Sequence, residues 1–179
     1  MNYAFFDVDL ITELEFYEIK GADYEELVKV CFRYSESLSM WFSSFLDWGE
    51  QLKPYEINVD PNCFEYAPPY DRISPPKNDV GFHIHFYRIC PELYHILMDH
   101  MHGIWDGYNY EKPSDMHFYR ADGTCFFRTD SHNGECFFYL REGEDVSSVV
   151  SKENWHCESD LWPGAIPSPR PDGYRPLVK

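Results

Sequence analysis

The chain has 179 residues, a length typical of one domain with a substantial hydrophobic core. Its 31 acidic and 15 basic side chains give a net charge of −16, which argues against nucleic acid and anionic membranes as partners because both require a basic surface. Hydrophobic residues make up 44% of the chain and aromatic residues 18%, so most of it has enough apolar surface to fold. We therefore expect a single domain over residues 1–179.

The start of the chain and its cysteines indicate a cytoplasmic protein. The N-terminal stretch MNYAFFDVDL carries acids among its apolar residues and lacks the basic segment of a signal peptide. No apolar run approaches the roughly 20 residues that a membrane helix needs. The six cysteines form no CxxC pair, which is typical of reduced and mostly buried thiols.

The first third of the chain predicts a strand and one long helix. Residues 13–16 alternate acidic and apolar side chains, which is the period of a half-buried strand. From Asp23 onward the apolar residues follow helical spacing, with Glu26 placed for a capping box and Gly49 for a helix stop. This pattern predicts a helix over 23–47.

Prolines dominate the segment 54–79, where they preclude a helix and weaken any strand. We expect a long surface segment there, with one short strand near 63–66. The run at 79–89 then predicts a strand, and 91–102 predicts a short helix with a proline in its first turn. A second proline-rich stretch, 158–179, is expected to form a surface tail.

The stretch 115–141 predicts a three-stranded meander. The dipeptides Asp-Gly at 122–123 and Asn-Gly at 133–134 are favoured two-residue hairpin turns. Simple turns would pair Tyr119 with Phe126, and the alternation then separates two faces. The expected core face consists of Met116, Phe118, Cys125, Phe127, Cys136, Phe138 and Leu140. The expected outer face consists of His117, Tyr119, Phe126, Arg128, Tyr139 and Arg141.

Residues 142–150 and 152–158 predict a short acidic helix and a last strand. Together these elements predict an α+β fold with an antiparallel sheet of about five or six strands. The phenylalanine-rich face of the sheet is expected to pack against the helices at 23–47 and 91–102.

The tetrapeptide HFYR occurs twice, at 85–88 and 117–120. In each copy we expect Phe to face the core, with His and Tyr on the outer face. If the two strands are neighbours, His83, His85 and His117 converge there as a zinc-type ligand set. The alternative functional interpretation is therefore a metal-dependent or small-molecule enzyme that uses zinc or another divalent metal. The main interpretation requires no cofactor.

The sequence does not otherwise predict an enzyme. It contains no GxSxG elbow, no SxxK pair and no glycine-rich phosphate loop, so no catalytic residue is assigned. An aromatic sheet face with arginines would also suit RNA stacking, but the acidic charge and the lack of an RNP motif argue against it.

Acid clusters beside aromatic residues predict a protein-binding surface. Acids near helix starts favour the helix dipole, but the surplus is larger than helix caps explain. Charges of this kind steer a basic partner, and aromatic side chains anchor it. The predicted partner-binding residues are Glu13, Glu15, Glu142, Glu144, Asp145, Tyr119, Tyr139 and Trp155.

A small, acidic, aromatic-rich single-domain chain without an active-site motif resembles bacterial immunity proteins. The resemblance is one of composition over the whole chain, and it transfers no functional residue. It implies an inhibitor that neutralises a basic toxin or nuclease by binding it, as a monomer or homodimer. A subunit of an acidic assembly would share the same binding prediction.

Overall fold

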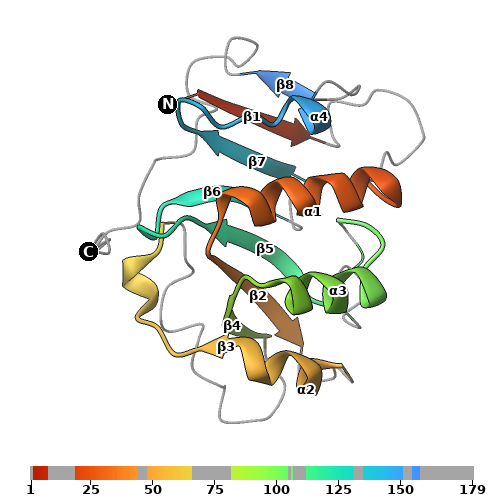
Figure 1. Ribbon diagram of the computed structural model, residues 1–179, viewed down its shortest axis with the longest axis vertical. Coiled ribbons are helices and arrows are strands. Elements are labelled where there is room, and N and C mark those ends of the chain that lie inside the picture. Colours follow the sequence, from red (N-terminus) through yellow and green to blue (C-terminus); the bar gives the residue numbers. More distant parts are fainter. Residues whose placement is uncertain are drawn as a thin grey trace.

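The protein is described by a computed structural model over residues 2–7, 19–43, 48–65, 82–104, 106, 112–130, 135–150 and 155–157. One antiparallel sheet runs through these residues, and helices pack against one of its faces (Figure 1). The predicted α+β class is confirmed. None of the described helices is long and apolar enough to cross a membrane.

The sheet has the strand order β3-β4-β2-β5-β6-β7-β1-β8. Six strands of six or seven residues form its body, and the short strands β3 and β8 extend its two edges. The strands are β1 Asn2–Asp7, β2 Ser37–Ser43, β3 Glu56–Ile57, β4 Phe82–Arg88, β5 Ser114–Tyr119, β6 Cys125–Asp130, β7 Glu135–Leu140 and β8 Trp155–Cys157. The helices are α1 Ala22–Tyr34, α2 Gly49–Leu52, α3 Pro91–His100 and α4 Ser147–Val150, with 3-10 turns η1 Lys53–Tyr55 and η2 Pro61–Cys63.

The predicted helix over 23–47 is wrong from Ser35 to Ser43, and residues 44–47 lie outside the described residues. α1 ends at Tyr34, and the chain turns into β2, which lies in the sheet between β4 and β5. Leu38 and Met40 alternate with serines along β2, and this two-residue period suits a strand as well as the apolar spacing suits a helix. β2 forms a strand because it pairs with β4 on one side and with β5 on the other, and because Leu38 and Met40 are buried. Gly49 begins α2 instead of ending a helix.

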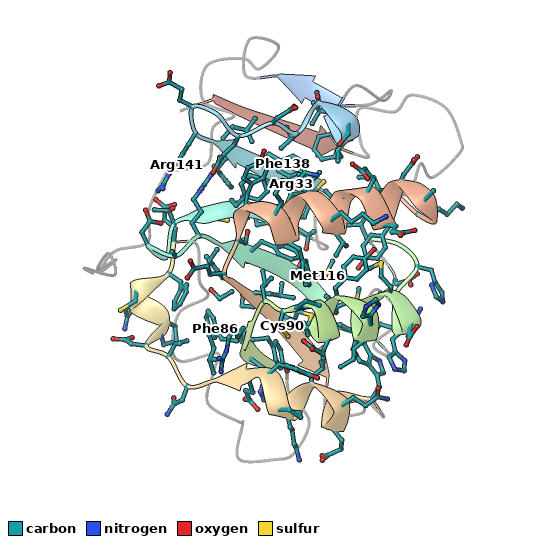
Figure 2. The ribbon with its side chains drawn as sticks, in the orientation of Figure 1. Arg33, Phe86, Cys90, Met116, Phe138 and Arg141 are labelled. Atoms are coloured by element: carbon teal, nitrogen blue, oxygen red, sulfur yellow. The ribbon has the colours of Figure 1, made fainter. Side chains whose placement is uncertain are left out.

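The main core lies between the helices and one face of the sheet, here called the helix face. α1 contributes buried residues at helical spacing, and α3 contributes Leu93 and Leu97. Met116 of β5 and Phe138 of β7, both labelled in Figure 2, belong to the same cluster. The sheet and α1 residues that share this core include Leu27, Val28, Cys31, Leu38, Met40, Tyr87, Phe118, Phe126, Phe127 and Cys136.

The opposite face of the sheet is also buried, and we call it the second face. Tyr119, Phe137 and Phe86 lie in one cluster there, together with Phe64. Phe64 follows η2 within the predicted proline-rich segment, and its ring packs 4.9 Å from those of Phe86 and Tyr119. The strand predicted near 63–66 is wrong in its described part, because Cys63 ends η2 and residues 64–65 are not in a strand. The described strand of this segment is β3, and residues 66–79 fall outside the described residues.

The first hairpin of the meander turns differently from the prediction. Arg120 pairs with Thr124 around a three-residue loop that ends at Gly123, whose φ of 79° is the left-handed conformation that glycine favours. A bulge follows, in which Tyr119 pairs with Cys125 and Phe118 pairs with Phe127. Because of the bulge, two residues lie on the face opposite to the predicted one. Cys125 was expected on the core face and lies on the second face, whereas Phe126 was expected on the outer face and packs in the helix-face core.

The second hairpin keeps the predicted faces despite a different register. Asp130 pairs with Glu135, and Arg128 pairs with Phe137, where the prediction had paired Arg128 with Tyr139. The register is therefore shifted by two residues. Because side chains alternate with a period of two, a shift of two leaves each residue on its predicted face.

Arg120 joins the first hairpin to the end of β7. Its guanidinium makes two hydrogen bonds of 2.6 Å to the carboxylate of Glu144, and both side chains are almost fully buried, at 9% and 11% exposed. It also donates to the carbonyls of Cys125 and Tyr139 and lies over the ring of Phe126. Burial alone would raise the pKa of Glu144, but hydrogen bonds from Arg120 and the Arg141 backbone hold it below its ordinary value.

Gly123→Ala tests the hairpin geometry. An alanine side chain at a φ of 79° is strained, so we expect the free energy of unfolding to fall by about 1–2 kcal/mol. Urea denaturation measures this change. Gly49→Ala is the control, because a Cβ at Gly49 meets open space, and it should be neutral. Equal effects at the two glycines would contradict the three-residue turn.

Glu144→Gln tests the Arg120 pair. Removing one charge of a buried pair leaves the other uncompensated, so we expect a loss of roughly 3 kcal/mol in the free energy of unfolding at pH 7. Since the folded-state pKa of Glu144 is lowered, this contribution is present above the ordinary carboxyl pKa and is lost as the pH falls through the lowered value. The difference between wild type and variant should therefore shrink in acid. The exposed neighbour Glu142→Gln should change stability by less than about 0.5 kcal/mol.

Candidate functional site

The predicted partner-binding residues do not form one surface. Glu142 and Asp145 are exposed in the segment between β7 and α4. Trp155 of β8 is half-buried, and its ring packs 5.3 Å from that of Phe138. Glu13 and Glu15 lie outside the described residues.

Three of the predicted contact residues are structural, and their assignment to a partner surface needs correction. Glu144 is held in its buried pair with Arg120. Tyr139 is buried on the second face, where its hydroxyl accepts a hydrogen bond from Arg128 at 2.9 Å. Tyr119 is fully buried, and burial raises the pKa of its hydroxyl well above the usual range, so it stays a neutral phenol. The prediction for the two tyrosines is wrong because it takes the second face to be open, and the prediction for Glu144 is wrong because it takes the whole acid cluster to be exposed.

The two HFYR copies face opposite ways. In the second copy Phe118 lies in the helix-face core, and His117 and Tyr119 lie on the second face, as predicted. In the first copy Phe86 lies on the second face, and Tyr87 packs in the helix-face core. Sequence alternation cannot orient the first copy, because both of its faces carry aromatic residues and both faces of the sheet are buried.

The predicted histidine set therefore does not converge. His117 pairs across the strands with Ser39, and the Ser39 hydroxyl lies 3.2 Å from that of Tyr119 on the second face. His85 pairs with Met40, which belongs to the helix-face core. The sheet thus separates His85 from His117, and the side chain of His83 is outside the described part. Among the described residues no group of three His, Cys, Asp or Glu side chains could hold a metal ion.

His85 instead pairs with a carboxylate at the edge of the sheet. Its Nδ1 lies 2.6 Å from Glu56 of β3, and both side chains are more than a third exposed. They line a shallow cleft of about 530 Å³ with Ile57 and Phe86. A histidine beside a carboxylate can act as a general base, but no serine, threonine or cysteine is among the described residues that line this cleft.

The fold does bring two acid clusters together that are far apart in the sequence. Ser148 of α4 donates a 2.7 Å hydrogen bond to Glu26 of α1, and the backbone N–H of Asp145 donates to the hydroxyl of Tyr34 at 3.0 Å. α4 and the residues before it consequently pack against α1. We call the resulting surface the acidic edge, and its exposed or half-exposed carboxylates are Asp23, Glu25, Glu26, Glu142 and Asp145.

Two carboxylates of the acidic edge, Glu25 and Asp145, are stabilised in the charged form. Hydrogen bonds from the Ser147 side chain and backbone, with Arg33 nearby, hold the pKa of Asp145 below its ordinary value. Hydrogen bonds from Lys29 and Tyr94 do the same for Glu25. Both clusters are visible in the sequence, but their contact is not, because the hydrogen bonds that link them join residues more than 100 positions apart.

Comparison with protein-family models, curated proteins and solved structures found no match to this chain.

Alanine variants of the two histidines test their separation. His117 is buried with its Nδ1 3.3 Å from the Tyr119 hydroxyl, so His117→Ala should lower the free energy of unfolding by about 1–3 kcal/mol. The pair of His85 with Glu56 is exposed, so His85→Ala should cost less than about 1 kcal/mol. Thermal unfolding with and without zinc measures both. A zinc-induced rise in melting temperature that either variant abolishes would contradict the separation.

Proposed function

We propose that this protein binds a basic protein partner through the acidic edge, in the manner of an immunity or inhibitor protein that neutralises a toxin. The observation that supports this proposal most is the contact between α1 and α4, which gathers two separate acid clusters on one surface. In a chain with a net charge of −16, this surface is suited to steer and orient a basic protein.

The shape of the acidic edge also favours a protein partner over a small cation. α1 has 13 residues and is therefore about 20 Å long, a length that suits a protein interface. Tyr34 is half-buried at this surface, where its hydroxyl accepts the hydrogen bond from the Asp145 backbone, and such an aromatic side chain can supply the apolar contacts that charges alone do not. The enzyme alternative has lost the support of its proposed ligand set, because His85 and His117 lie on opposite faces.

The test compares two variants that each remove three negative charges. Glu26→Gln, Glu142→Gln and Asp145→Asn together remove the charge from three of the five carboxylates of the acidic edge while keeping the side-chain shapes. Glu50→Gln, Glu56→Gln and Asp60→Asn together neutralise exposed acids around α2 and β3, at the other end of the sheet (Figure 1). Circular dichroism first establishes that both variants are folded.

Immobilised wild-type protein is incubated with a lysate of its source cells at low salt and eluted with 1 M salt, where the Debye length is about 3 Å. The captured protein is then identified, purified and titrated against all three forms by calorimetry. We expect a basic partner that binds the acidic-edge variant at least tenfold more weakly, because three exposed charge pairs contribute roughly 0.5–1 kcal/mol each. The control variant should bind as the wild type does.

The inhibitor part of the proposal has its own readout. Expression of the captured partner alone should arrest growth, and co-expression of this chain should restore it, with weaker rescue by the acidic-edge variant. Capture of no protein at low salt, or equal affinity of the two triple variants, would refute binding through the acidic edge. If the partner binds at the acidic edge but does not affect growth, the proposal of a protein-binding module stands and the proposal of toxin neutralisation is refuted.

A further inference from the structure

Basic side chains gather around one cleft of this otherwise acidic protein. A cleft of about 750 Å³ opens between the C-terminal part of α1, the end of β4 and the start of α3. Among the described residues, Lys29 and Arg33 of α1, Arg88 of β4 and His95 of α3 line it together with one carboxylate, Glu36, and a second carboxylate, Glu25, pairs with Lys29 beside it. In a chain with twice as many acids as bases, this local reversal of charge favours an anionic occupant.

Two of these side chains, Arg33 and Arg88, make no ion pair within 4 Å among the described residues, and Arg33 also lies near enough to Asp145 to lower its pKa. Lys29 is engaged in an ion pair of 2.7 Å with Glu25. Arg88 is exposed, and its side chain has no ion pair within the part of the chain that the structure describes. Arg33 is exposed at the end of α1 and is labelled in Figure 2, as is Cys90, which directly precedes α3. Arginine binds carboxylate, sulfonate and phosphate groups with paired hydrogen bonds.

The rest of the cleft is apolar and aromatic. Phe32, Ile89, Pro91 and Tyr94 line it, and the rings of Phe32 and Tyr94 meet edge-to-face at 5.6 Å. Small-molecule sites typically have volumes of about 300–1,000 Å³ and combine apolar walls with a few polar groups, a description that this cleft fits. The wall is suited to the flat apolar body of a ligand.

A buried hydroxyl at the same cleft supports a polar ligand atom. Ser35 lines the cleft between the end of α1 and β2, and it is only 8% exposed. Its Oγ is buried and has no hydrogen-bond partner among the described residues. Buried hydroxyls are normally hydrogen-bonded, and a bound ligand or its water would supply the missing partner.

The N-terminus of α3 does not itself provide the anion site. The Glu92 carboxylate accepts hydrogen bonds from its own backbone N–H and from Cys90, which lower the pKa of Glu92. The helix start is thus already partnered by an internal carboxylate. Recognition of an anion in the cleft falls to the side chains of Arg33 and Arg88.

We propose that this cleft binds a small aromatic anion, with its ring against Phe32 and Tyr94 and its charged group held by Arg33 and Arg88. The site is separate from the acidic edge in chemistry, although α1 contributes to both. Its occupant belongs to the class of aromatic carboxylates, sulfonates or phosphates.

The experiment uses anilinonaphthalene sulfonate as the probe, because it combines an aromatic body with one negative charge and fluoresces in apolar surroundings. We expect saturable binding of one probe per chain, and weaker binding of the neutral analogue phenylnaphthylamine. Arg88→Gln should weaken sulfonate binding about tenfold, the effect of losing one charge-assisted hydrogen bond. Lys20→Gln is the matched control: Lys20 is exposed outside the cleft, and its variant should bind as the wild type does.

Cys90 gives a second readout at the site itself. It is a half-buried free thiol that lines the cleft, and Cys63 is a half-buried free thiol elsewhere in the same chain. The probe should slow alkylation of Cys90, followed by mass spectrometry, and leave the rate at Cys63 unchanged. Absence of probe binding, equal binding by Arg88→Gln and wild type, or unprotected Cys90 at saturating probe would each overturn the proposal.

Discussion

The buried guanidinium of Arg120 links elements that the rest of the structure depends on. Through Glu144 and two backbone carbonyls it fastens the bulged hairpin of β5 and β6 to the end of β7. Glu144 lies between Glu142 and Asp145, so the same pair fixes the segment that runs along α1. A charge in this position must be fully partnered, because an isolated buried cation would be strongly destabilising. The acidic edge is therefore a consequence of an internal ion pair.

Burial of both faces of the sheet limits where function can reside. The helix face is covered by α1 and α3, and the second face is filled by aromatic residues that include Phe64 from the proline-rich segment. Sheet residues that looked like an exposed platform, such as Tyr119 and Tyr139, are packing residues. Among the described residues, the helix surfaces and the sheet edges remain for recognition. α1 is central to both proposals, since Glu26 belongs to the acidic edge and Arg33 to the basic cleft.

Local patterns predicted some elements well and others poorly for identifiable reasons. The start of α1, the helix at α3 and the meander followed from helical spacing, a first-turn proline and two glycine turns. The residues of β7 lie on their predicted faces although the predicted pairing with β6 is wrong, because the register differs by two residues. By contrast, β2 was assigned to a helix, because a short apolar run satisfies both periods until its neighbours are known. The bulge at Phe126 likewise depends on turn geometry that the dipeptide Asp-Gly does not specify.

By itself the sequence determined the α+β class, the acidic charge and the alternation within most strands, because each of these is a property of composition or of residues close along the chain. Tertiary structure alone decided which face each HFYR copy presents, that Glu144 is a buried partner of Arg120, and that Glu26 meets Ser148. These outcomes depend on long-range pairing and on the burial of both sheet faces. A strand with aromatic residues on both sides carries no local signal for its own orientation, so only its neighbours can set it.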